Sequence, residues 1–178
     1  PVNLGSSVGI RKAKNREELI EALDYAFTFS IRVLVENAIT KLREINCSVL
    51  GDYENAEASE CEEPFANDEI LSYQDKYAGG TKSGKSGMAS LKRKIPADIS
   101  PETREEIRAM AVKAFKALGC SGVSRIDFMI DEETGNIYLN EINTIPGFTP
   151  ISMYPKLMEN MGISYPELLD RLIQLAME

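Results

Sequence analysis

The chain contains no histidine and only three cysteines among its 178 residues. Without histidine it cannot hold a Ser-His-Asp triad, a Cys-His pair or a His-ligated zinc ion. Proton transfer and metal binding therefore fall to carboxylates, lysine, tyrosine and backbone N–H groups. Cys47, Cys61 and Cys120 are odd in number and show no Cys-x-x-Cys spacing, which favours free thiols in a reducing compartment over a disulfide framework.

Basic residues and long apolar runs are also scarce. Twenty Lys and Arg stand against 28 Asp and Glu, giving a net charge of −8, which argues against nucleic acid or an anionic membrane as a partner. No apolar run approaches the roughly 20 residues that span a bilayer, and no segment resembles a signal peptide. We therefore expect a cytoplasmic protein. The chain begins with Pro1 and not with Met, and we expect it to be part of a longer protein.

Hydrophobic periodicity and capping residues predict a mixed α+β fold. Helices are expected at 16–28, 101–118, 153–161 and 164–177. Strands are expected at 31–36, 44–50 and 69–73, and a hairpin at 122–130 and 136–143. The acidic stretch 52–69 is expected to be irregular before its strand, and the Gly/Ser/Lys-rich stretch that ends at 94 is expected to form a mobile loop.

Charged side chains alternate with apolar ones along the predicted hairpin. If the turn lies at its centre, Asp127 faces Glu141 and Arg125 faces Asn143 across the two strands. Two facing carboxylates repel each other unless a proton or cation lies between them, and all-oxygen ligands favour Mg²⁺ or Mn²⁺. A solvated hairpin face with a surface ion pair is the competing interpretation. Asn140 falls on the apolar face, which this register does not explain.

Two glycine-rich segments resemble phosphate-binding loops. Residues 79–86 match G-x-x-x-x-G-K-[ST], but polar residues precede them and no helix pattern follows, so we do not expect an independent nucleotide site. Residues 4–9 (LGSSVG) are small and could hold anionic oxygens with backbone N–H groups, although an ordinary turn explains them as well.

Several motifs together resemble those of D-alanine:D-alanine ligases of the ATP-grasp superfamily. In order along the chain these are GSSVG, VLVE followed by REI, Y-x-x-K-Y, GxSRIDF and LNEINTIPGFTPISMYP. The resemblance implies an ATP-grasp fold. Residues 1–40 would be part of the small ATP-clamping subdomain, and 41–178 the C-terminal catalytic subdomain with a mobile lid at about 74–94.

The same resemblance implies a function. Such ligases use ATP to phosphorylate one D-alanine, and a second D-alanine attacks the D-alanyl phosphate to give D-alanyl-D-alanine for peptidoglycan, cell wall biogenesis and cell shape. They are homodimers, joined mainly through an N-terminal domain that is absent here, so these 178 residues are expected to be inactive alone. There are two alternatives. One is a ligase with another second substrate such as D-Ser, and the other is a non-catalytic module that binds Mg-ATP.

Residue roles follow only where this sequence matches the family motifs. Two Mg²⁺ or Mn²⁺ ions would be held by Asp127, Glu141 and Asn143. Arg125 and the N–H of Gly147 would stabilise the acyl phosphate and the oxyanion, and Ser152 with Met153 would bind the second D-alanine.

The remaining matches concern ATP and the lid. ATP would be contacted by Ser7, Glu36, Ile39, Glu44, Lys76 and Met129. Ser6 and Tyr77 would form a hydrogen-bonded pair that closes the lid, and a tyrosine there indicates D-alanine specificity. Residues 40–44 are one residue longer than the spacer expected before the ribose-binding Glu44.

Overall fold

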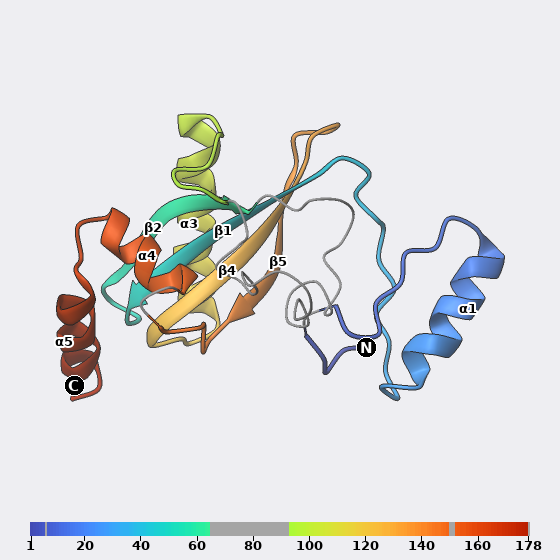
Figure 1. The fold of residues 1–178 in the computed structure, drawn as a ribbon, viewed down its shortest axis with the longest axis horizontal. Coiled ribbons are helices and arrows are strands. Elements are labelled where there is room, and N and C mark those ends of the chain that lie inside the picture. The colour runs from blue at the N-terminus through green and yellow to red at the C-terminus, as the bar shows by residue number, and fades with distance from the viewer. Residues whose placement is uncertain (6, 65–92, 150–151, 178) are drawn as a thin grey trace, which may run out of the picture. The chain divides into compact units, whose positions relative to one another are not determined.

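The computed structural model describes residues 1–5, 7–64, 93–149 and 152–177 (Figure 1). The chain divides into two compact units, of which the first contains Pro1–Ile39 and the second contains Thr40–Phe65 and Leu91–Glu178. The expected strand at 69–73 and most of the expected lid lie outside the described residues. No helix within the described ranges is long and apolar enough to cross a membrane.

Helix α1, Arg16–Phe27, is the regular element of the first unit and confirms the helix predicted there. Asn15 caps it, accepting a hydrogen bond from the Glu18 N–H at 2.8 Å. The Glu18 carboxylate in turn accepts from the Lys14 N–H at 2.8 Å. These reciprocal bonds satisfy N–H groups that a helix start otherwise leaves unpaired.

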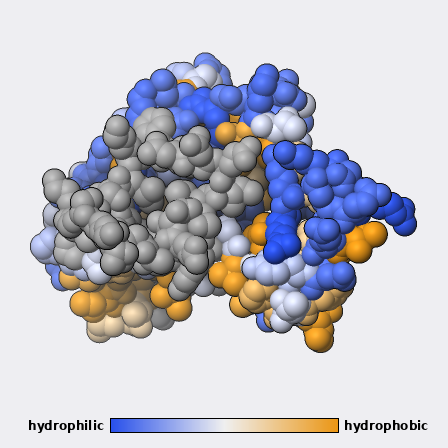
Figure 2. Space-filling view, turned by 45° about the vertical axis from the view of Figure 1, so that its right-hand side comes forward, coloured by the Kyte–Doolittle hydropathy of each residue, from blue (hydrophilic) through white to orange (hydrophobic). Residues whose placement is uncertain are grey.

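The strand predicted at 31–36 is wrong, because this segment is irregular in the structure. The described part of the first unit contains no strand with which it could pair, and a strand forms only where a neighbour supplies its hydrogen bonds. Its apolar residues are consequently exposed, Ile31 to 93% and Leu34 to 67%. Figure 2 shows that hydrophobic surface interrupts an otherwise largely hydrophilic exterior.

The second unit is built on a five-stranded antiparallel sheet in the order β3-β2-β1-β4-β5. The strands are β1 Leu42–Gly51, β2 Ala56–Pro64, β3 Arg93–Lys94, β4 Gly122–Asp131 and β5 Ile137–Asn143. Strand β1 and the β4–β5 hairpin confirm predicted elements.

Strand β2 lies inside the stretch 52–69 predicted to be irregular, so that prediction is wrong for residues 56–64. Strand β3 forms at residues 93 and 94, so the loop predicted for 78–94 is wrong at its end. Its acidic residues are matched by cations from other elements: Glu63 with Arg43 at 2.7 Å, and Glu62 with Arg93 at 3.3 Å. Tertiary ion pairing thus compensates for the poor intrinsic strand preference of glutamate.

Helix α3, Pro101–Ala117, covers one face of the sheet (Figure 1). Ser100 caps it, accepting from the Thr103 N–H at 3.1 Å. The core beneath it joins α3 to the sheet through the fully buried residues Ile107, Ala111, Phe115, Ile45, Cys47, Val49, Ile126 and Phe128.

Helices α4, Met153–Asn160, and α5, Tyr165–Leu175, cover one end of the opposite face. They bury Leu50 of β1 together with Tyr154 and Leu168. The Tyr154 hydroxyl donates to the Val49 carbonyl at 3.0 Å, and burial raises the pKa of this hydroxyl. The middle of this face carries the polar side chains of Asn46, Arg125 and Asp127.

Candidate active site

Strands β4 and β5 bring the predicted charged residues together. Asp127 lies opposite Glu141 and Arg125 opposite Asn143, which confirms the predicted pairing. Burial alternates along β4 as expected, with the apolar side chains facing α3. Arg125 and Asp127 therefore occupy the polar face.

An irregularity in β5 explains why Asn140 did not fit a regular alternation. The register shifts between Asp127 and Phe128, since Asp127 pairs with Glu141 whereas Phe128 pairs with Leu139. Asn140 is the extra residue, as in a β-bulge, where two residues oppose one. The shift keeps Leu139 and Ile142 on the α3 side while Glu141 faces Asp127.

Asp127 is held from two sides. The Arg125 guanidinium donates to both of its oxygens, Nε to Oδ1 and Nη2 to Oδ2, each at 2.6 Å. The Asn143 amide donates to Asp127 Oδ2 at 3.2 Å and to Glu141 Oε1 at 3.4 Å. Asn143 thus links the two carboxylates, and its own side-chain oxygen keeps acceptor capacity.

Burial and neighbouring charge act on this cluster in opposite directions. Burial raises the pKa of Asp127 and outweighs the opposing pull of Arg125, and the charge of Glu141 adds to the rise. For Arg125, burial lowers the pKa, but the hydrogen bonds and charge of Asp127 and the charges of Glu141 and Glu62 outweigh it and raise the pKa. Asp127 is therefore a carboxylate whose ionised form is favoured by added positive charge.

The donor set fits a hard divalent cation. Asp127, Glu141 and Asn143 offer oxygen atoms as metal ligands. The set has only two carboxylates, and the described residues contain no group of three or more His, Cys, Asp or Glu side chains that could hold a metal ion. Mg²⁺ typically takes one or two protein carboxylates and completes its shell with water and substrate phosphates. The cluster suits a cation that arrives with phosphate.

Two predicted ATP residues are direct neighbours on the same face. Glu44 of β1 lies opposite Met129 of β4, two residues along each strand from the Asn46–Asp127 pair. Glu44 is exposed and Met129 is half-buried. A carboxylate beside an apolar thioether can contact a ribose hydroxyl and an adenine ring respectively.

The loop before α4 brings together the residues predicted to bind the second D-alanine. The Ser152 hydroxyl accepts from the Thr149 N–H at 3.0 Å, and a Cβ added to Gly147 would lie 3.2 Å from the Ser152 Oγ. Met153 extends this cluster to the sheet, because its Sδ accepts from the Asn46 amide at 3.2 Å. The loop therefore lies beside Asn46, which is paired with Asp127.

Other predicted residues lie in the first unit or outside the described residues. Ser7 has a φ of +59°, in the left-handed region that favours glycine, within a turn closed by the Val8 N–H to Gly5 carbonyl bond at 3.2 Å. Glu36 is exposed and Ile39 is half-buried. The predicted residues outside the described ranges are Ser6, Lys76 and Tyr77.

Sequence reasoning missed two members of the polar face, Asn46 and Glu62. Asn46 pairs with Asp127 on one side and with Glu62 on the other. A row of polar side chains, the polar row, therefore crosses four strands. It consists of Glu62, Asn46, Asp127 and Glu141. Only a strand assignment for 56–64 could have placed Glu62 in this row.

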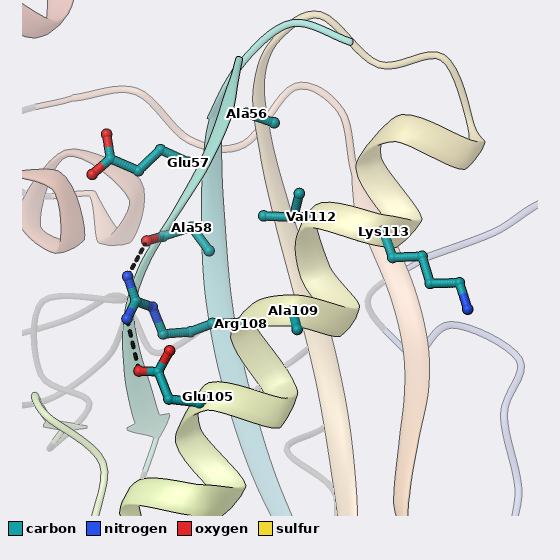
Figure 3. Close-up of a pocket in the computed structure, with 8 residues that line it drawn as sticks. All are labelled: Ala56, Glu57, Ala58, Glu105, Arg108, Ala109, Val112 and Lys113. Atoms are coloured by element: carbon teal, nitrogen blue, oxygen red, sulfur yellow. Dashed lines mark hydrogen bonds and ion pairs between the residues drawn. The ribbon is translucent and has the colours of Figure 1, made fainter. Parts of the chain in front are cut away.

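A hollow of about 510 Å³ lies elsewhere, between β2 and α3 (Figure 3). Arg108 crosses it, donating to the Ala58 carbonyl at 3.1 Å and pairing with Glu105 at 2.8 Å. Glu105 pairs with the charge of Arg108 within the protein, and the hollow is on the α3 side of the sheet. It has no part in the polar row.

Comparison with known proteins decides the family. The family model described as "D-ala D-ala ligase C-terminus" matches residues 1–174. The chain belongs to this family. The D-alanine–D-alanine ligase of Acetivibrio thermocellus is 51% identical over the whole chain, which covers 44% of that protein. The ligase of Thermoanaerobacter sp. (strain X514) is 52% identical, with 47% covered. The chain thus spans about half the length of the curated ligases it matches.

Solved structures of this ligase family share the fold. The ligase from Coxiella burnetii superposes with a TM-score of 0.77 at 36% identity, covering 98% of this chain and 43% of that one. The VanG D-Ala:D-Ser ligase from Enterococcus faecalis gives 0.78 at 37%, covering 96% and 46%. The Bacillus anthracis ligase, in complex with ATP, gives 0.68 at 28%, covering 92% and 48%.

Proposed function

We propose that this chain is the C-terminal catalytic part of a cytoplasmic, homodimeric ligase that joins two D-alanines for peptidoglycan synthesis. The ligase uses ATP, releases ADP and phosphate, and proceeds through a D-alanyl phosphate. The observation that carries the proposal is the pairing of Asp127 with Glu141 and of Arg125 with Asn143 on one sheet face. Family membership and about 50% identity to ligases along the whole chain support it.

The polar row would help to balance the negative charge of the ATP phosphates during phosphoryl transfer. Asp127, Glu141 and Asn143 would hold two Mg²⁺ or Mn²⁺ ions, whose charge offsets that of the ATP phosphates. Arg125 is the cation beside Asp127, and its guanidinium would stabilise the D-alanyl phosphate. Ser7 and Lys76 would contact the phosphates, and Ser6 with Tyr77 would close the lid.

The loop before α4 would position the second substrate. Ser152 and the Met153 N–H would hold the carboxylate of the second D-alanine, so that its amine faces the acyl carbon. The Gly147 N–H would stabilise the oxyanion as phosphate leaves. Glu36, Ile39, Glu44 and Met129 would bind the nucleoside. Two hydrogen bonds between Thr149 and Ser152 support this role, because they tie the Ser152 hydroxyl to the loop that contains Gly147.

The decisive experiment replaces Glu141 with alanine in a full-length ligase that carries this chain. D-alanine-dependent ADP release should fall by at least about 100-fold, because a carboxylate ligand is lost. Glu141 is exposed on an edge strand, so circular dichroism and the melting temperature should hardly change.

Glu133→Ala is the matched control, since this exposed glutamate lies in the turn of the same hairpin, where it accepts from the Thr40 hydroxyl at 3.2 Å and pairs with Lys41 at 3.6 Å. Its activity should equal that of the wild type. Full activity of Glu141→Ala would remove the cation assignment.

A D-alanine:D-serine ligase is the second candidate, favoured by the structural similarity to VanG. Phosphate release with D-alanine alone, compared with D-alanine plus D-serine, separates the two. We expect D-alanine alone to suffice.

A further inference from the structure

Glu62 is a buried acid on the candidate site face to which the proposed mechanism assigns no role. Its side chain is 0% exposed. It lies in β2 opposite Asn46, which lies opposite Asp127. Glu62 is therefore the deepest member of the polar row, whereas Glu141 is its exposed end.

Burying this carboxylate is costly and poorly compensated. Its ion pair within the described residues is with Arg93, Nε to Oε1 at 3.3 Å, and neither oxygen accepts a hydrogen bond of good geometry there. Burial raises the pKa of Glu62, while the charge of Arg93 and the side-chain amide of Asn46 oppose the rise. An apolar residue of similar volume would stabilise a fold better at such a position.

The next residue shows what a stabilising pair in this strand looks like. Glu63 faces the α3 side, where its two oxygens accept from the Arg43 Nε at 2.8 Å and Nη2 at 2.7 Å. This bidentate geometry is that of a strong arginine–carboxylate pair. Glu62 lacks it, so stability does not account for Glu62.

The charges on the site face suggest a different role. Both Asp127 oxygens are occupied by Arg125, yet a cation ligand must offer at least one of them. Other anions can draw Arg125 away from Asp127, and Glu62 and Glu141 both attract it. Glu62 also repels Asp127, which increases the demand for a cation there.

We propose that Glu62 is a positioning residue of the Asp127–Glu141 cation site, a buried negative charge that strengthens divalent-cation binding and draws the Arg125 guanidinium away from Asp127. Glu62 is not itself a ligand, because its side chain is fully enclosed. This inference rests on the proposed function, which places the cation at Asp127 and Glu141.

Mn²⁺ binding to the 178-residue chain, followed by electron paramagnetic resonance, tests the proposal without requiring catalysis. Glu62→Gln removes the charge and keeps the shape, and it should weaken Mn²⁺ binding about tenfold. Glu62→Asp keeps the charge and should restore most of the affinity. Glu63→Gln, the matched control on the opposite face, should bind Mn²⁺ like the wild type.

Thermal unfolding separates this role from a purely structural one. Glu62→Gln should keep or raise the melting temperature while Mn²⁺ binding falls, whereas Glu63→Gln should lower the melting temperature and leave Mn²⁺ binding unchanged. Failure of Glu62→Gln to fold would overturn the proposal, because the charge is expected to cost stability.

The outcomes also distinguish this inference from the proposed function. Equal Mn²⁺ affinity of Glu62→Gln and the wild type overturns the inference alone. Equal weakening in Glu62→Gln and Glu63→Gln does the same, since the effect would not depend on the face. A wild-type chain that binds no Mn²⁺ would also contradict the cation site of the proposed function.

Discussion

At the scale of single residues, the polar face follows from two different kinds of information. Arg125 and Asp127 can be placed on one face from strand alternation, and Glu141 and Asn143 from the hairpin turn. Glu62 cannot, because its partner Arg93 is 31 positions away along the chain and in a two-residue strand. Long-range charge pairs leave no local pattern.

The stability cost of Glu62 should depend on pH. Its pKa in the folded protein is raised by burial above the ordinary 4.5, so the folded state keeps this proton to higher pH than the unfolded state does. As pH rises from the ordinary value through the raised one, the wild type should therefore lose stability relative to Glu62→Gln.

Urea unfolding of both proteins at a series of pH values from about 4 to 8 measures this difference. The advantage of Glu62→Gln should grow with pH and then level off above the raised pKa. A difference that instead grows toward acid pH would contradict the assigned burial of the charge.

At the scale of elements, the helices were predictable and strands β2 and β3 were not. The caps Asn15, Ser100 and Ser164 each accept a hydrogen bond from a backbone N–H three residues on. The start of each of these helices is therefore determined by residues close together in the sequence. Strand β2 depends on cations from other elements, and the segment 31–36 lacks a described strand partner. Strands need neighbours that a local pattern does not reveal.

The bulge at Asn140 should matter for cation binding and little for folding. Deleting Asn140 keeps Asp127 opposite Glu141 and leaves the apolar residues facing α3, but it removes the local bend of β5. We expect circular dichroism to be unchanged and Mn²⁺ affinity to fall about tenfold, because ligand orientation changes.

Asn140→Ala is the control, since it keeps the extra residue and should bind Mn²⁺ normally. Unchanged affinity after deletion would show that the bulge only absorbs a register difference.

At the scale of the whole molecule, the predicted machinery is distributed over two units. Ser7, Glu36 and Ile39 belong to the first unit, and the cation and substrate residues to the second. The chain also covers only 43% to 48% of the similar ligase structures. We therefore expect this chain alone not to complete the proposed reaction.

The 178-residue chain should therefore show no Mg²⁺- and D-alanine-dependent ADP release under conditions in which a full-length ligase is active. Coupled detection of ADP measures this, with the Glu141→Ala chain as background. Release above that background would show that these residues suffice for the first half-reaction.

The sequence alone determined the α+β class, the helix starts, the hairpin and its facing pairs, and the family resemblance. These features depend on residues close together in the chain or on motifs that keep their order. Tertiary structure alone decided that an acidic segment forms β2, that Asn140 is an extra residue in β5, and that Glu62 lies in the row with Asp127. In each case the partner that makes the arrangement favourable lies on another strand, and only folding brings the two together.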